Sequence, residues 1–213
     1  DSENYLFVTL DTSGAQAQDL VLTLTDNDRS QRTVHYPLEK RKEGSASRKG
    51  FGPEDAIYLI APDRFENGNT ANDNVDGYQD KVDRQFKGGR HGGDIQGIVD
   101  NLDYIKSMGF TQIWTMPMLE NAMDKYSYHG YSTTDYYRID PRFGSNDAFI
   151  DFSEKAKSEG VGVIMDMVLN HIGSNHRWME DTPSKDWINN EGKFVGTTHK
   201  RESLHDPHAI ESD

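Results

Sequence analysis

The chain has 213 residues, a formal net charge of -13 and no cysteine. This composition excludes disulfide bonds, thiolate metal sites and cysteine nucleophiles, and the negative charge disfavours binding to the phosphate backbone of nucleic acids. No apolar run approaches the roughly 18 residues that span a bilayer, so we expect no transmembrane segment.

Three segments near the N-terminus have the composition of β-strands. They cover residues 4–10, 20–25 and 32–36. The first is rich in aromatic and β-branched residues, the second alternates apolar and polar positions, and we expect Pro37 to end the third. These strands predict the C-terminal part of a β-sandwich, which we assign to residues 1–44. A polar, glycine-containing linker is expected at 45–54.

From residue 55 onward, short apolar strands alternate with amphipathic helices. The expected strands cover 56–60, 111–115 and 161–165, and the expected helices surround 95–105 and 148–156. Gly109 and Gly160 stand where each helix should end, and Ser145 stands at the N-cap of the second. This order predicts an α/β fold with parallel strands, as a doubly wound sheet or as the first part of an eight-stranded barrel.

The loops favour the barrel. Two long connections, at 62–93 and 117–144, leave the carboxyl ends of the first two strands, where barrel active sites lie. No glycine-rich phosphate fingerprint follows the first strand, which disfavours a dinucleotide-binding sheet. We assign residues 55–171 to the first part of the barrel. Residues 172–213, which show no periodicity, are assigned to the start of an inserted subdomain after the third strand.

The third expected strand begins as a continuous apolar run, which indicates burial on both faces, and it ends in Asp166, Asn170 and His171. Polar residues at the carboxyl end of a buried parallel strand are typical of an active site. A core strand followed by a polar, hydrogen-bonded loop would give the same pattern. These residues alone leave both interpretations open.

The first long loop is rich in asparagine, aspartate and glycine. The relevant residues are Asn67, Asn69, Asn72, Asp73, Gly92 and Asp94. Such side chains supply the hard oxygen ligands that Ca²⁺ prefers, although they also build turns without any ion. Asp94 also stands where the N-cap of the first helix is expected.

The second long loop combines Tyr128, His129, Tyr131 and Asp135. Tyrosine rings stack on the apolar face of a sugar, and neighbouring polar groups bond its hydroxyls. A packed aromatic loop without a ligand is the alternative. The stretch 140–144, which leads into the second helix, is predicted to be a structural turn.

The complete set of motifs resembles the α-amylase family of glycoside hydrolases, over about residues 55–213. The matching segments are Gly109–Pro117, His129–Tyr131, Asp135–Tyr137 and Asp166–His171. The first loop is most similar to the cyclomaltodextrinase and neopullulanase branch, through Pro62–Asn69, Asn72–Asp73 and Gly92–Asp94. Members of that branch carry an N-terminal β-sandwich before a TIM barrel.

The resemblance implies the fold and the activity. The fold would comprise the first three β/α units of a TIM barrel with long loops, preceded by the last strands of a β-sandwich. The activity would be hydrolysis, with retention, of α-glucosidic bonds in maltodextrin, cyclodextrin, pullulan or starch. His129, Tyr131 and His171 would contact the sugar, with Tyr131 stacking on its ring. Asp166 would support the catalytic carboxylates.

The resemblance also implies calcium as the cofactor. Its ligands would come from Asn67, Asn69, Asn72, Asp73, Gly92 and Asp94. The branch often has aspartate where Asn69 stands, which removes one negative charge from the expected site.

The family takes its nucleophile from the fourth strand and its general acid from the fifth. We therefore expect both beyond Asp213 and expect this N-terminal portion to be inactive by itself. The alternatives are a catalytically inactive amylase-like protein that binds glycans or a partner, and a calcium-stabilised structural module. Substrate preference, oligomeric state and compartment stay open. A homodimer is one expectation, and a periplasmic or secreted location is favoured over the cytoplasm because degradation of a polymer suits an exported protein.

Overall fold

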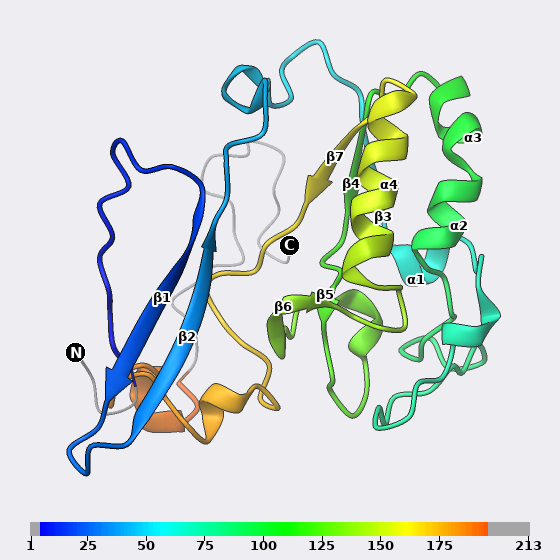
Figure 1. Cartoon of the computed structure of the whole chain (residues 1–213). Coiled ribbons are helices and arrows are strands. Elements are labelled where there is room, and N and C mark those ends of the chain that lie inside the picture. The colour runs from blue at the N-terminus through cyan, green and yellow to red at the C-terminus, as the bar shows by residue number, and fades with distance from the viewer. Residues whose placement is uncertain (1–4, 196–213) are drawn as a thin grey trace, which may run out of the picture.

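The computed structural model describes residues 5–195. Its N-terminal part contains a two-stranded antiparallel hairpin (Figure 1). Strand β1 (Gln18–Thr25) pairs with β2 (Gln31–Leu38), and residue 18 lies opposite residue 38. Pro37 lies within β2, so the prediction that it ends the strand was wrong. A strand in a two-stranded ribbon has a free edge, where the missing N–H of proline costs no ladder bond.

The strand expected at 4–10 is absent from the described residues 5–10, which have no regular secondary structure. Leu6 is 59% exposed and Phe7 is 71% exposed, so this segment has neither a pairing strand nor a covering layer. The composition of this segment is typical of a strand, but a strand also needs a neighbour to pair with, and no described strand pairs with residues 5–10.

The central element is a three-stranded parallel sheet with the strand order β3-β4-β7. Its strands are β3 (Ile57–Ile60), β4 (Gln112–Thr115) and β7 (Gly162–Met165). Leu59, Trp114 and Ile164 lie side by side in the register. The three predicted strands are therefore confirmed as parallel neighbours, with their carboxyl ends at one edge.

Helices lie against this sheet. They are α1 (Pro62–Phe65), α2 (Ile95–Asp100), α3 (Leu102–Ser107) and α4 (Asn146–Ser158). The single helix expected over 95–105 is divided at Asn101, whose amide side chain donates to the carbonyl of Gly97 at 2.8 Å. Ser145 caps α4 by accepting from the Ala148 N–H, as predicted.

The hydrophobic core lies between the helices and one face of the sheet. Ile98, Ile105, Ile113 and Phe152 are fully buried there. The other face is open: Leu59 is 52% exposed and Trp114 is 38% exposed. The expectation that the third strand is buried on both faces is therefore wrong in the described structure, because α2, α3 and α4 cover only one side.

The second long loop contains a small antiparallel hairpin that was not predicted, formed by β5 (Leu119–Glu120) and β6 (Asp135–Ile139). After β7 the chain makes a long excursion with short 3₁₀ turns, and Figure 1 shows this excursion beside the N-terminal hairpin. The Trp178 indole N–H donates to the Tyr5 hydroxyl at 2.8 Å, which joins the excursion to the segment that precedes β1.

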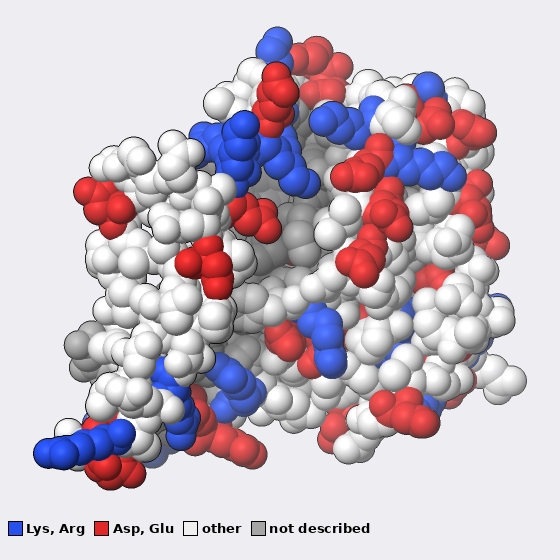
Figure 2. Space-filling view, in the orientation of Figure 1, with Lys and Arg blue, Asp and Glu red and all other residues white. Residues whose placement is uncertain are grey.

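Acidic and basic side chains are distributed in small groups over the face of the molecule in Figure 2. Within the part of the chain that the structure describes, no helix is both long enough and apolar enough to cross a membrane.

Candidate functional site

The site is centred on Asp166, which follows β7 directly. One of its carboxylate oxygens, Oδ2, accepts the indole N–H of Trp114 at 3.2 Å and the hydroxyl of Tyr131 at 3.1 Å. Trp114 belongs to β4, and Tyr131 belongs to the long loop after β4. Three segments that are far apart in the chain therefore meet at the carboxyl edge of the parallel sheet.

His129, Tyr131 and His171 are joined by hydrogen bonds. The Tyr131 N–H donates to His129 Nδ1 at 2.9 Å, and His171 Nε2 donates to the Tyr131 carbonyl at 2.7 Å. Because an imidazole nitrogen that accepts carries no proton, His129 is assigned the Nε2–H tautomer, and His171 is protonated at Nε2 as well. The structure thus brings the three residues predicted to contact the sugar together with Asp166, which was predicted to support the catalytic carboxylates.

Gly130 allows this arrangement. It has φ +78°, and a Cβ at this position would collide with the carbonyl oxygen of Pro117. Only glycine combines this backbone conformation with such a close approach. The tight turn brings the rings of His129 and Tyr131 to a centroid separation of 5.9 Å with 29° between their planes.

Ionisation of these groups follows from their surroundings. Burial lowers the pKa of His129, so the imidazole is neutral at pH 7. Burial raises the pKa of the Tyr131 phenol, and the negative charge of Asp166 raises it further. The site therefore offers a neutral imidazole donor, a protonated phenol with an accessible ring, and a carboxylate.

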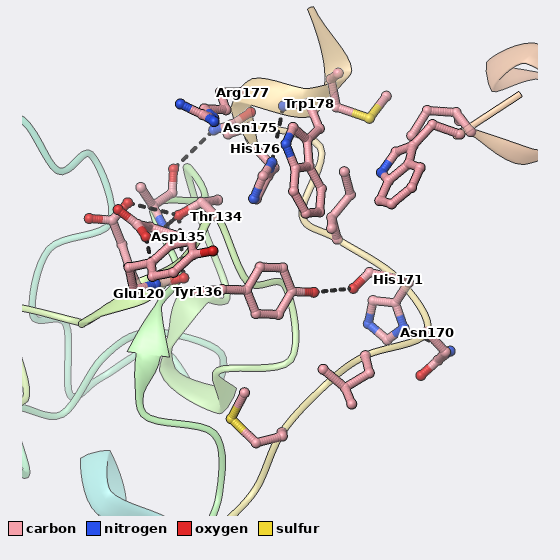
Figure 3. Close-up of a pocket in the computed structure, with 18 of the residues that line it drawn as sticks. Glu120, Thr134, Asp135, Tyr136, Asn170, His171, Asn175, His176, Arg177 and Trp178 are labelled. Atoms are coloured by element: carbon pink, nitrogen blue, oxygen red, sulfur yellow. Dashed lines mark hydrogen bonds between the residues drawn. The ribbon is translucent and has the colours of Figure 1, made fainter. Parts of the chain in front are cut away.

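A pocket of about 1250 Å³ opens beside His171. Figure 3 shows Tyr136 and Trp178 on its wall together with Asn170 and His171. The ring centroids of Tyr136 and Trp178 are 6.1 Å apart, so this wall carries two neighbouring aromatic rings. Aromatic walls of this kind suit the apolar face of a sugar ring.

Two contributors to the site were not singled out from the sequence. Trp114 holds Asp166, and the Tyr136 hydroxyl lies 2.9 Å from the carbonyl oxygen of His171. Trp114 pairs with Ile164 in the parallel sheet, and Ile164 stands two residues before Asp166 on the same face. The alternation of side chains along the predicted strands was therefore a usable signal for Trp114. No comparable spacing rule connects Tyr136 with His171.

The six residues predicted to bind calcium also lie together. The Asn67 amide donates to Asp73 Oδ1 at 2.7 Å, and the Asn72 amide donates to Asp94 Oδ2 at 3.2 Å. The Asn69 N–H donates to the same Asp94 oxygen at 2.9 Å. Asp94 is also the N-cap of α2, as predicted, since it accepts the Gly97 N–H at 2.8 Å.

This loop contains oxygens that lack a donor. The side-chain oxygens of Asn67 and Asn72 are buried and accept no hydrogen bond from any residue between 5 and 195. Gly92 has φ +89°, and a Cβ there would lie 2.6 Å from both Asn67 Nδ2 and Asp73 Oδ1. Buried acceptors without donors around a space reserved by glycine match what a hard cation requires.

No group of three or more histidine, aspartate or glutamate side chains is arranged to hold a metal within residues 5–195. A cation in the first loop would therefore depend on amide and main-chain oxygens in addition to Asp73 and Asp94. Asn69 contributes a further turn, because its side-chain oxygen accepts the Ala71 N–H at 3.1 Å.

A carboxylate and two imidazoles at the carboxyl edge of a parallel α/β sheet, beside a pocket with an aromatic wall, are typical of carbohydrate-active proteins of the barrel class. Comparison with known families agrees. The α-amylase catalytic domain matches residues 59–212, and the N-terminal domain of cyclomaltodextrinases matches residues 1–42. The first match covers more than half of the chain, which therefore belongs to the α-amylase family.

Individual relatives of the chain include named amylolytic enzymes. A cyclomaltodextrinase of Thermoanaerobacter pseudethanolicus is 36% identical over 170 residues, which cover 73% of this chain and 27% of the relative. A β/α-amylase of Paenibacillus polymyxa is 44% identical over 118 residues, 55% of this chain and 10% of the relative. The chain thus spans only a minor part of the relatives that it matches.

Solved structures show the same similarity. An Anoxybacillus α-amylase superimposes with a TM-score of 0.57 and 45% identity, covering 62% of this chain and 28% of that protein. The cyclic α-maltosyl-(1→6)-maltose hydrolase of Arthrobacter globiformis, in complex with cyclic α-maltosyl-(1→6)-maltose, superimposes with a TM-score of 0.52 and 27% identity. It covers 73% of this chain and 34% of that hydrolase.

Proposed function

We propose that these residues form one wall of the sugar-binding site of an amylolytic hydrolase that cleaves α-glucosidic bonds in maltodextrin-like substrates with retention. The observation that carries this proposal is the convergence of His129, Tyr131 and His171 on Asp166. The names of the relatives, which include cyclomaltodextrinase, neopullulanase and oligo-1,6-glucosidase, support an α-glucan as substrate.

Each residue has a distinct role in this proposal. The Tyr131 ring stacks on a glucose ring, and His129 donates from Nε2 to a sugar hydroxyl. The Asp166 carboxylate orients Tyr131 through the 3.1 Å hydrogen bond to its phenol. The Nε2 proton of His171 is already used by the Tyr131 carbonyl, so this imidazole offers its ring edge to the substrate while it fixes the loop.

The open face of the sheet supports the finer description of the fold. We infer that the three parallel strands are the first three β/α units of a TIM barrel, with Trp114 and Leu59 facing its interior. The two-stranded hairpin would be the last part of a β-sandwich, and the excursion after β7 the start of an inserted subdomain. A homodimer stays an expectation that analytical ultracentrifugation can check.

The purified 213-residue chain should not hydrolyse maltodextrins. A retaining glycosidase requires a nucleophile and a general acid about 5 Å apart, and we assign both to later strands of the barrel. The measurement is release of reducing sugar from maltodextrin, cyclodextrin and pullulan. Turnover that co-purifies with the chain and disappears in Asp166→Asn would contradict this assignment.

We also propose that the first loop binds calcium. The donor-free oxygens of Asn67 and Asn72 and the carboxylates of Asp73 and Asp94 would hold the ion, which would supply the missing partner for the two amide oxygens. Ca²⁺ in excess should raise the melting temperature, and a chelator should lower it again, because a ligand that binds only the folded state stabilises it.

A matched pair of variants tests the calcium proposal. Asn67→Ala removes one of the donor-free oxygens and should abolish most of the calcium-dependent shift in melting temperature. Asn27→Ala, an exposed change in the turn between β1 and β2, should leave the shift intact. Equal shifts in both variants would contradict calcium binding at this loop. A shift caused by calcium with no response to maltooligosaccharide would favour the calcium-stabilised structural module instead.

A further inference from the structure

The segment that carries His171 has little intrinsic structure. Residues 166–169 between β7 and the loop are neither helix nor strand. Val168 is buried, whereas Leu169 is 80% exposed and Met167 is 44% exposed. Packing therefore anchors this segment at one point only, and hydrogen bonds must determine where its last residue lies.

Those hydrogen bonds come from the preceding long loop. The Gly173 N–H donates to the Thr133 carbonyl at 2.8 Å, which fixes the chain beyond His171. The Tyr136 hydroxyl lies 2.8 Å from the Val168 carbonyl oxygen. It also lies 2.9 Å from the His171 carbonyl oxygen (Figure 3). One phenolic proton is thus shared between the carbonyl groups of Val168 and His171, which are three residues apart in the chain.

Tyr136 is itself held firmly. Its ring packs against His176 at a centroid separation of 5.8 Å and against Trp178 at 6.1 Å. Burial raises the pKa of its phenol, so the hydroxyl keeps its proton throughout the neutral range. A fixed ring whose hydroxyl keeps its proton can clamp the main chain of residues 168–171 in one position.

We propose that Tyr136 is a positioning residue for His171. Its hydroxyl fixes the main chain over residues 168–171, and this placement brings His171 Nε2 within 2.7 Å of the Tyr131 carbonyl. Both hydrogen bonds of its hydroxyl go to main-chain carbonyl groups, so in this role Tyr136 acts through the backbone. The proposal deepens the proposed sugar site, and it rests on the proposed function only in assigning His171 to that site.

The test uses Tyr136→Phe in the 213-residue chain, which removes the hydroxyl and keeps the ring. Tyr137→Phe is the matched control, because Tyr137 is the next residue of β6, is 90% exposed, and its hydroxyl bonds nothing within residues 5–195. ¹⁵N NMR of the imidazoles reports the tautomer of His171 and the solvent exchange of its Nε2 proton. The His171 signal is assigned by its loss in His171→Gln.

In Tyr136→Phe, the Nε2 proton of His171 should exchange about 2- to 10-fold faster, the factor that corresponds to one net hydrogen bond. The His171 nitrogen shifts should move toward those of a freely exchanging imidazole, while the His129 signals stay unchanged. Tyr137→Phe should match the original chain. If a purely structural packing role were correct, the ring-preserving variant would leave the His171 signals unmoved, and that result overturns the proposal.

Two further outcomes distinguish this proposal from a non-specific effect of the substitution and from the proposed sugar-binding function. Equal movement of the His171 signals in Tyr136→Phe and Tyr137→Phe would also overturn it, since the clamp would then have no specific role. Maltooligosaccharide added to each variant tests the proposed function independently. Binding by none of them would count against the sugar site, while the movement of His171 would still support the clamp.

Discussion

Asp94→Ala should destabilise the chain by about 2–4 kcal/mol, because it removes a fully buried acceptor that serves four donors. The fully buried carboxylate accepts four hydrogen bonds, from the main-chain N–H groups of Gly68, Asn69 and Gly97 and from the side chain of Asn72. The substitution also removes the N-cap of α2, which alone is worth about 1 kcal/mol. Urea unfolding in calcium-free buffer measures the loss.

Asp100→Ala is the matched control for this prediction. Asp100 is the last residue of the same helix and is exposed, and among the described residues it accepts only from the Gln96 side chain, at 2.7 Å. Its loss should change the free energy of unfolding by no more than about 0.5 kcal/mol. A similar, small effect of both substitutions would show that the carboxylate of Asp94 does not organise the first loop.

Arg142→Met should cost about 3–5 kcal/mol at pH 7, because it leaves the buried charge of Asp140 without its partner. The two side chains are 1% and 0% exposed, and they are joined at 2.7 Å and 2.9 Å. Arg142 also donates to the carbonyls of Asp80 and Asn121, so its loss frees further buried acceptors.

The same pair predicts a pH dependence. Burial acts to raise the pKa of Asp140, but the hydrogen bonds and charge of Arg142 outweigh it, and the pKa lies below its ordinary value of 3.8. A depressed carboxyl pKa contributes stability above the unfolded value, and this contribution is lost as the pH falls through the folded value. In Arg142→Met, the hydrogen bonds and the positive charge of Arg142 no longer oppose the effect of burial on Asp140, so the pKa of Asp140 rises. The stability difference between the two proteins should therefore shrink between pH 7 and pH 3.

Unfolding by urea at both pH values provides the measurement, with Lys106→Met as the control. Lys106 forms an exposed pair with Glu159 at 3.4 Å, and such surface pairs contribute less than about 1 kcal/mol. A difference for Arg142→Met that stays constant with pH would show that the charge of Asp140 is not the source of the loss.

Periodicity and capping predicted much of the fold. The three parallel strands, the caps at Asp94 and Ser145 and the helix ends at Gly109 and Gly160 all follow from local patterns, and the structure confirms them. Local patterns succeed here because spacing along the chain decides which side chains share a face.

The predictions that were wrong failed for a different reason. A strand at 4–10 would need a partner strand, and burial of β7 on both faces would need a second layer of structure. A local sequence pattern reports neither. The β5–β6 hairpin was missed because β5 has only two residues. For the candidate site, motifs selected Tyr131 and Asp166, whereas the contacts that Trp114 and Tyr136 make depend on which distant segments meet.

The turn after β6 also combines a feature that the local sequence predicted with contacts that it could not predict. Its proline, glycine and aspartate predicted a structural role, which the buried pair of Asp140 and Arg142 confirms. Its links to Asp80 and Asn121 could not be read from the sequence, because they join residues 62 and 21 positions apart.

The most direct test of the central claim is a titration of the 213-residue chain with a maltooligosaccharide, followed by the indole ¹⁵N–H signal of Trp114. This signal is assigned by its loss in Trp114→Phe, and it reports on Asp166 through the 3.2 Å hydrogen bond. We predict a saturable shift with a Kd of about 1 mM, which is lost in Tyr131→Ala and is absent with a β-linked cellooligosaccharide. No saturable shift, or a shift that survives Tyr131→Ala, would contradict the assignment of these residues to a sugar-binding wall.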